Sequence, residues 1–153
     1  MTARCEDEGM CATNLWAVNA AAFTPEFERF TAEQIGVAPQ VSELRIASSR
    51  VRASSVVFTL TQRMCDCDSL IGRGDDGPVD GEVAAQDWLT WLRELPTQVP
   101  HVSRLAVLRA WSPQDDDAAP RHAKGVTISE VTEQVIRGLK DDSLLTIDYP
   151  RTA

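Results

Sequence analysis

Apolar and polar positions alternate most clearly in residues 56–64. One face of an extended chain would carry the apolar side chains Val56, Phe58, Leu60 and Met64. The other face would carry Thr59, Thr61 and Arg63. A period of two predicts a strand with one buried face. A weaker apolar run at residues 41–47 predicts the strand before it. We expect these two strands to form an antiparallel hairpin.

Three more strands are predicted from shorter or less regular apolar runs. Residues 11–18 combine large apolar side chains with small ones, and residues 144–149 form a last apolar run near the end of the chain. Residues 102–111 carry leucine, valine and alanine on both faces. Apolar residues on both faces are typical of a central strand of a sheet.

The first predicted helix has local signals at both ends. Thr24 is suited to accept the free amide hydrogens of the first turn, and Pro25 suits the first helical position. Phe27 and Phe30 lie three residues apart and begin an apolar stripe. Gly36 favours a helix end there.

The second predicted helix has the most regular apolar spacing in the chain. Trp88, Trp91, Leu92 and Leu95 repeat at helical intervals. Proline cannot donate a backbone hydrogen bond inside a helix, so Pro96 is expected to end this one.

The third predicted helix begins with a capping box. Thr127 and Glu130 stand in the Thr-x-x-Glu arrangement, in which each side chain bonds to the other residue's backbone amide. Val131, Val135 and Leu139 continue the apolar face at helical spacing. The stretches at 65–81 and 112–125 are polar and rich in aspartate, and they are predicted to be loops.

These elements predict an α+β protein with one mixed or antiparallel sheet and helices packed on it. The order strand, helix, strand, strand, helix, strand is that of a ferredoxin-like β-α-β-β-α-β unit, followed by an extra C-terminal helix and strand. No stretch is long enough to separate two domains. Residues 10–153 are therefore expected to form a single domain, and residues 1–9 a solvated extension before it.

The composition is that of an ordinary globular protein. In 153 residues, 43 % are hydrophobic and 25 % are charged, which excludes the collagen-like, disordered and disulfide-scaffold classes. The net charge of −8 argues against non-specific nucleic-acid binding, because that requires neutralisation of phosphates. Arginine strongly outnumbers lysine, which favours a GC-rich, bacterial genome.

The start of the chain and its apolar runs indicate the compartment. Residues 1–9 contain three acidic residues and no apolar run, unlike a secretory signal. No apolar stretch approaches the roughly 20 residues needed to span a bilayer. The protein is therefore expected to be cytoplasmic, with no membrane association, and its four cysteines to be reduced.

Cys65 and Cys67 flank Asp66 directly after a predicted strand and form the densest chemical cluster. Zinc prefers four ligands, so Cys5 and Cys11 or the two histidines would have to complete a site. The neighbouring acidic residues disfavour a reactive thiolate, because reactive thiols need nearby positive charge. Plain reduced thiols without a cofactor are the first interpretation, and zinc binding or thiol chemistry through this pair is the alternative.

Two aromatic residues and one histidine are further candidates. Trp88 and Trp91 lie on one helix face, where core packing is the first interpretation. Tryptophan is also enriched at binding hot spots, so the pair could anchor a dimer or another partner. His101 stands at a helix-to-strand junction, where it could line a site at the sheet end. The motifs of known catalytic triads and zinc proteases do not occur in the sequence.

Charge is unevenly distributed along the chain. Residues 41–63 hold four arginines, including Arg45, Arg50 and Arg52, against one glutamate. Residues 64–87 hold seven acidic residues against one arginine. A basic hairpin followed by an acidic loop could orient an anionic partner or a second copy of the chain.

The sequence therefore predicts a small cytoplasmic accessory or interaction domain without catalytic activity, which binds a protein partner or forms a homo-oligomer. One alternative is a metal-binding or thiol-dependent protein that uses Cys65 and Cys67. A second alternative is a small-ligand-binding protein or enzyme with a pocket between the sheet and the helices.

Overall fold

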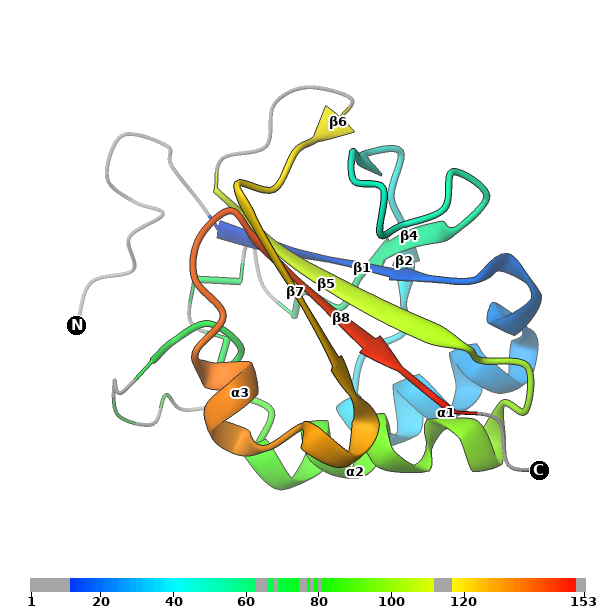
Figure 1. Ribbon diagram of the computed structural model, residues 1–153. Helices are drawn as coiled ribbons and strands as arrows, with labels where there is room; N and C mark the ends of the chain where they lie inside the picture. Colours follow the sequence, from blue (N-terminus) through cyan, green and yellow to red (C-terminus); the bar gives the residue numbers. More distant parts are fainter. Residues whose placement is uncertain are drawn as a thin grey trace.

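A computed structural model describes residues 12–62, 66–67, 69–74, 77, 79, 81–111 and 117–150. Its main feature is one mixed six-stranded sheet with three α-helices, which confirms the predicted α+β class (Figure 1). The helices are α1 (Pro25–Ile35), α2 (Ala85–Gln98) and α3 (Glu133–Arg137). The strands of this sheet are β1 (Ala12–Val18), β2 (Gln40–Val41), β4 (Val56–Thr59), β5 (Arg104–Trp111), β7 (His122–Thr127) and β8 (Ser143–Asp148). Two short strands, β3 (Arg45–Ile46) and β6 (Asp117–Ala118), form a separate parallel pair.

The spatial order of the sheet is β2-β4-β1-β5-β8-β7. All neighbouring strands are antiparallel except β7 and β8, which are parallel. The strand predicted at 41–47 is divided between β2, which pairs with β4, and β3, which belongs to the small pair. Because of this division, the ferredoxin-like order stays a prediction.

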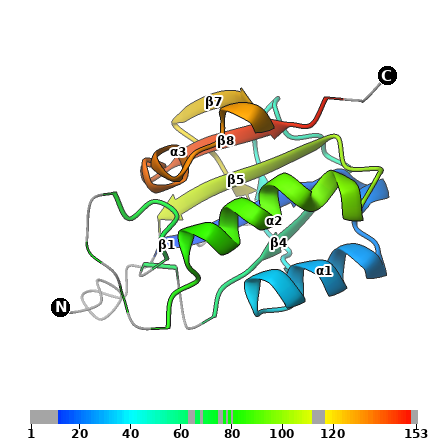
Figure 2. The same ribbon diagram turned by 90° about the horizontal axis from the view of Figure 1, so that it is seen from below.

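The helices lie together on one face of the sheet, which we call the helix face (Figure 2). Large side chains fill the space between the two layers. Trp16 of β1 stacks on Trp88 of α2 at 5.6 Å between ring centroids, and it meets Trp91 edge-on at 5.2 Å. Phe27 of α1 and Phe58 of β4 complete the aromatic centre at 5.4 Å from each other. Burial of these rings is the main source of stability of this layer.

Helix α1 forms as its sequence signals predict. The Thr24 hydroxyl accepts a hydrogen bond from the Phe27 amide at 3.2 Å, and Pro25 occupies the first helical position. The helix ends at Gly36, whose φ of 90° is in the left-handed region that glycine adopts at low cost.

Helix α2 does not end at Pro96 as predicted, and continues to Gln98. A proline at this position has no amide hydrogen to give the carbonyl of Leu92, four residues earlier. The hydroxyl of Tyr149 donates to that carbonyl at 2.7 Å instead. A partner that is distant in sequence therefore satisfies the group that the proline leaves free.

The region after β5 differs from the sequence prediction in two ways. Strand β7 lies in a stretch predicted to be a loop, because Val126 alone among its six residues is buried. The helix predicted from Thr127 is divided into a 3₁₀ turn, Ile128–Glu130, and the short α3. The Thr127 capping box is present, but Thr132 caps a second start by accepting from the Val135 amide at 3.3 Å.

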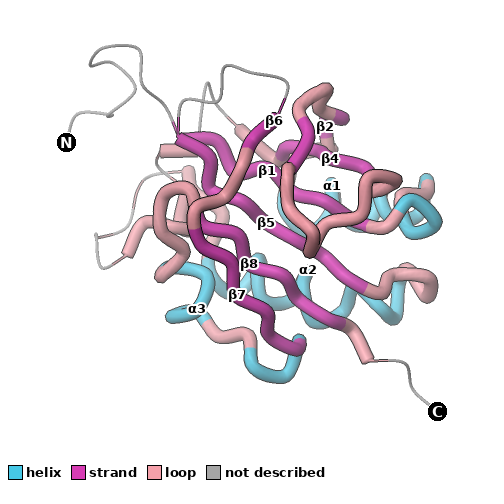
Figure 3. The backbone as a smooth tube through the Cα atoms, turned by 45° about the horizontal axis from the view of Figure 1, so that its top comes forward, coloured by secondary structure: helices cyan, strands magenta, loops and turns pink. Residues whose placement is uncertain are grey.

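The opposite face of the sheet, which we call the outer face, is covered by the small β3–β6 pair and the chain around it (Figure 3). Its core contains no aromatic side chain among the described residues, and β1 and β5 contribute three alanines and two leucines to it. Within the part of the chain that the structure describes, no helix is long and apolar enough to cross a membrane.

Candidate functional site

A row of small residues crosses the outer face from one strand to the next. Ala17 of β1 lies opposite Ala106 of β5, which lies opposite Thr146 of β8, which in turn lies opposite Gly125 of β7. Residues in register share a face of the sheet, so their short side chains line up. The row is therefore a line of small side chains across four strands.

The connection between β3 and β4 crosses over this row. It encloses a hollow of about 230 Å³ that we call the arginine hollow. Its floor contains the Ala17–Ala106 pair, and its sides carry three arginines. The lining residues are Ala17, Asn19, Arg50, Val51, Arg52, Ser55, Ser103, Arg104, Ala106 and Asp148.

The absence of a side chain at Gly125 leaves room for one of these arginines. A β-carbon at this position would lie 2.9 Å from Arg50 Nη1 and 3.2 Å from Thr146 Oγ1. The tip of Arg50 therefore lies directly over the β7 backbone.

Arg104 is the arginine of the hollow that is already engaged. Its Nε donates to Asp148 Oδ1 at 2.6 Å, and its Nη1 donates to the carbonyl of Arg50 at 3.1 Å. The second bond joins β5 to the crossing connection. Arg104 therefore holds the backbone of the hollow in position.

Arg50 and Arg52 are exposed, and their guanidinium groups have no hydrogen-bond or ion-pair partner among the described residues. Arg45 lines an adjoining hollow of about 280 Å³ together with Arg52. The two hollows share Val51, Arg52 and Ser55. The structure thus brings together the three arginines predicted to bind an anion. Planar guanidinium groups with free N–H donors are well suited to carboxylate and phosphate groups.

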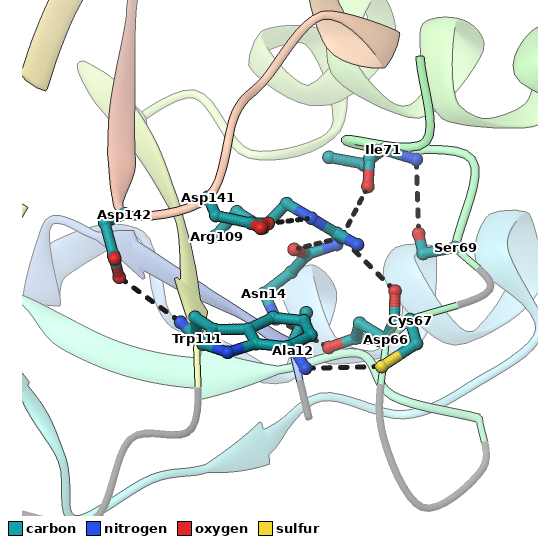
Figure 4. Close-up of polar contacts among 10 residues, drawn as sticks. All are labelled: Ala12, Asn14, Asp66, Cys67, Ser69, Ile71, Arg109, Trp111, Asp141 and Asp142. Atoms are coloured by element: carbon teal, nitrogen blue, oxygen red, sulfur yellow. Dashed lines mark hydrogen bonds and ion pairs between the residues drawn. The ribbon is translucent and has the colours of Figure 1, made fainter. Parts of the chain in front are cut away.

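A second polar cluster lies on the helix face and is wholly different in character (Figure 4). Arg109 of β5 is 3 % exposed. Its Nη1 donates to the carbonyl of Ile71 at 2.9 Å, to the carbonyl of Asp66 at 3.2 Å and to Asn14 Oδ1 at 3.3 Å. Its Nε donates to Asp141 Oδ1 at 3.1 Å. These bonds fasten Asp66, Ile71 and Asp141 to the end of the sheet.

Asp66 is buried in the same cluster. Its Oδ2 accepts from the Asn14 amide at 2.7 Å and from the Thr61 hydroxyl at 2.8 Å. Burial raises the pKa of this carboxyl above its ordinary value of 3.8, and the two hydrogen bonds and the charge of Arg109 lower it in part. Asp66 is thus a structural carboxyl whose Oδ2 is held by two donors.

The absence of a side chain at Gly72 lets residues 69–74 pack closely against Arg109. Gly72 has a φ of 85°, and a β-carbon there would lie 2.3 Å from Arg109 Cδ. Its amide donates to the Ile136 carbonyl at 2.9 Å, and the Gly74 amide donates to the Arg137 carbonyl at 2.9 Å. The segment therefore also covers the end of α3.

The other predicted site residues are not gathered in one place. Trp88 and Trp91 are buried in the aromatic centre, and Trp91 Nε1 donates to Thr31 Oγ1 at 3.0 Å. A partner cannot reach these rings in this structure, which favours the core-packing interpretation. His101 is exposed, and its backbone carbonyl accepts from the Asn19 side chain at 2.9 Å.

The cysteine pair is described only in part. Cys65 lies outside the described residues, so the geometry of the pair stays a prediction. Cys67 is half-buried, and its Sγ accepts from the Ala12 amide at 3.3 Å. No group of three or more histidine, cysteine or acidic side chains that could hold a metal occurs among the residues with a described placement.

Comparisons with protein-family models, with curated proteins and with solved structures find no significant match to this chain. The functional argument therefore rests on the two clusters described above. The sequence indicated Arg45, Arg50 and Arg52 by their local charge. It gave no signal for Arg104 or Arg109, since each lies in an apolar strand and its partners are distant in sequence.

Proposed function

We propose that this protein is a cytoplasmic, non-catalytic interaction domain that binds carboxylate groups of an acidic protein partner in the arginine hollow. One observation carries the proposal. Arg50 and Arg52 line a hollow and have no partner among the described residues, while Arg104 and Asp148 fix its frame. Two unpaired guanidinium groups over a preformed depression favour a bidentate anionic ligand.

The charge distribution supports an attractive role for this surface. The chain as a whole carries a net charge of −8, so its average field repels anions. The arginine hollow is a local exception, because its lining contains three arginines and one aspartate. A positive patch on a negatively charged protein orients an acidic partner as the two proteins approach each other.

The lining also favours binding over catalysis. Arginine stays protonated at physiological pH, so it cannot act as a general base. Asp148 is the other ionisable residue of the lining, and Arg104 holds its carboxylate. The remaining polar side chains are one asparagine and two serines. Such a set can orient an anion, and the described part of the lining offers no paired acid and base.

A peptide titration tests the proposal. We expect a hexaglutamate peptide to bind saturably, and a hexaglutamine peptide not to bind, in calorimetry at low salt. The double variant R50Q/R52Q should weaken the affinity by about tenfold, because it removes two ion pairs worth together on the order of 1–2 kcal/mol. Arg29 is an exposed arginine of α1, so R29Q is the matched control and should leave the affinity unchanged.

Three results would contradict the proposal. They are an absence of hexaglutamate binding, equal loss of affinity in R29Q, and binding of inorganic phosphate with no binding of the peptide. Sedimentation of the protein alone tests whether the acidic partner is a second copy of the chain. In that case R50Q/R52Q should dissociate the oligomer and R29Q should not.

A further inference from the structure

We propose that a second hollow, between β7, β8 and α3, binds a small carboxylate with an apolar body. The hollow has a volume of about 420 Å³. It lies on the helix face, whereas the arginine hollow lies on the outer face, so the two sites are independent. Its lining residues are His122, Ala123, Lys124, Val135, Gly138, Leu139, Lys140, Ser143, Leu144 and Leu145.

The hollow exists because α3 is too short to cover the end of the sheet. This helix spans five residues and ends at Gly138. Val126 of β7 packs into the core of the helix face. Side chains alternate along a strand, so Lys124 and His122 are directed to that same face. Lys124 and His122 lie beyond the end of α3, where no helix covers them among the described residues, and they border the hollow.

The floor of this hollow is apolar. Leu145 is 3 % exposed and belongs to the same core cluster as Leu139. Val135 of α3 is half-buried and forms one wall. A depression of several hundred Å³ with an apolar floor and a few polar groups is the usual form of a small-ligand site.

The rim of the hollow is basic. Lys124, Lys140 and His122 line it, and no acidic residue lines it among the residues that the structure describes. The two lysines are the only lysines in the chain, and both stand at this one hollow. Their ammonium groups have no ion pair within 4.0 Å among the described residues. This arrangement is complementary to a negatively charged head on an apolar tail.

The acidic residues nearby in the sequence are bound elsewhere. Asp141 accepts from Arg109 at 3.1 Å. Asp142 accepts from the Trp111 amide at 3.3 Å and faces Arg121 at 3.9 Å. Glu130 accepts from Thr127 in its capping box, and the charge of Lys124 acts on it from further away. The two lysines therefore keep donors for a bound carboxylate.

Octanoate is the probe that tests the site, and octanol is its neutral counterpart. In a titration followed by NMR, octanoate should cause saturable shifts of the amides in β7 and in residues 135–145. Octanol should bind at least about fivefold more weakly, because it lacks the charge that the lysines recognise.

Three variants separate charge, shape and general effects. K124Q/K140Q keeps the length of both side chains and should weaken octanoate binding by about fivefold or more. V135W should fill the hollow and abolish binding of octanoate and octanol alike, with both lysines intact. R29Q is the control and should bind octanoate like the parent protein. Circular dichroism establishes that each variant is folded, and the lysine pair alone decides the test if V135W does not fold.

The proposal is overturned if octanoate shows no saturable shifts, or if its shifts spread over the aromatic centre. It is equally overturned if K124Q/K140Q binds octanoate as well as the parent protein does. Shifts confined to the arginine hollow would assign the carboxylate to that site and refute this one. Loss of hexaglutamate binding in R50Q/R52Q would not affect the result, so the two proposals can fail separately.

Discussion

Two groups of arginines, similar in chemistry, have opposite roles in this protein. Arg109 on the helix face is 3 % exposed and donates to four acceptors. Arg50 and Arg52 on the outer face are exposed and donate from their side chains to no described residue. The comparison shows that burial and satisfied donors mark an arginine that maintains the fold, while exposed and unpaired donors mark one that is available to a ligand.

The difference originates in what covers each face. At the end of β5 on the helix face, the carbonyls of Asp66 and Ile71 point at Arg109. Buried carbonyls need donors, and Arg109 supplies them. On the outer face, the Ala17–Ala106 pair leaves space, and the arginines above it meet solvent.

Removal of Arg109 should have the largest effect on stability. R109M leaves the carbonyls of Asp66 and Ile71 and the side chain of Asn14 without a donor. We expect a loss of roughly 3–5 kcal/mol in the free energy of unfolding, measured with urea. The matched variant R50M should change it by less than about 0.5 kcal/mol. Equal losses in the two variants would end the distinction between the arginines.

The second largest effect should come from crowding Arg109. G72A adds a β-carbon that would clash with Arg109 Cδ. It also places a residue with a side chain at a φ of 85°, which is an unfavourable backbone conformation for it. G74A is the control, because Gly74 has a φ of 71° but no atom within 4 Å of the added carbon. We expect losses of about 2–4 kcal/mol for G72A and about 1–2 kcal/mol for G74A in urea unfolding. Equal losses would show that backbone strain alone matters and that Arg109 is not tightly held.

A smaller effect that depends on pH should come from Asp66. Its pKa in the folded protein is raised above 3.8 by burial, so the folded state holds the proton more tightly than the unfolded state does. The resulting stabilisation is complete below pH 3.8 and is lost as the pH rises through the folded pKa.

D66N has no such proton and should lack this dependence. The stability of the parent protein relative to D66N should therefore fall as the pH rises from 3.8 towards neutrality, in urea unfolding at a series of pH values. A difference that stays constant over this range would show that burial does not perturb this carboxyl.

The elements that the sequence predicted well are those with local signals. Helix α1 begins after Thr24 and ends before Gly36, and both signals act within one turn. Helix α2 continues past Pro96 because Tyr149 supplies the missing donor, and no local pattern reveals a partner 57 residues away. Strand β7 was missed because an edge strand with one buried side chain has no clear alternation.

The same distinction holds for the sites. The local charge of residues 41–63 predicted that Arg45, Arg50 and Arg52 would form a basic surface, and the structure places them around two adjoining hollows. The hollow itself depends on the register of Ala17 and Ala106, which is a property of strand pairing. Arg109 stands in residues 102–111, which the sequence predicted to be an apolar central strand. Its hydrogen-bond partners come from three other segments of the chain, so the sequence did not indicate its role.

The smallest effect on stability should accompany a large effect on binding. R50Q/R52Q removes no described hydrogen bond of either side chain, so the free energy of unfolding should stay within about 0.5 kcal/mol of the parent value. Hexaglutamate binding should still fall by about tenfold in this variant.

Salt separates the two kinds of arginine in the parent protein. Its affinity for hexaglutamate should fall as sodium chloride is raised from about 0.01 M to 0.15 M, since the Debye length shrinks from about 30 Å to 8 Å. Because both arginines are exposed, their attraction to a ligand is screened by salt, whereas the bonds of Arg109 are shielded by burial. Urea unfolding of the parent protein at the same two salt concentrations should therefore change far less than peptide affinity does. A loss of stability in R50Q/R52Q comparable to that in R109M would instead place all of these arginines in the structural class, and the arginine hollow would no longer be a candidate for binding.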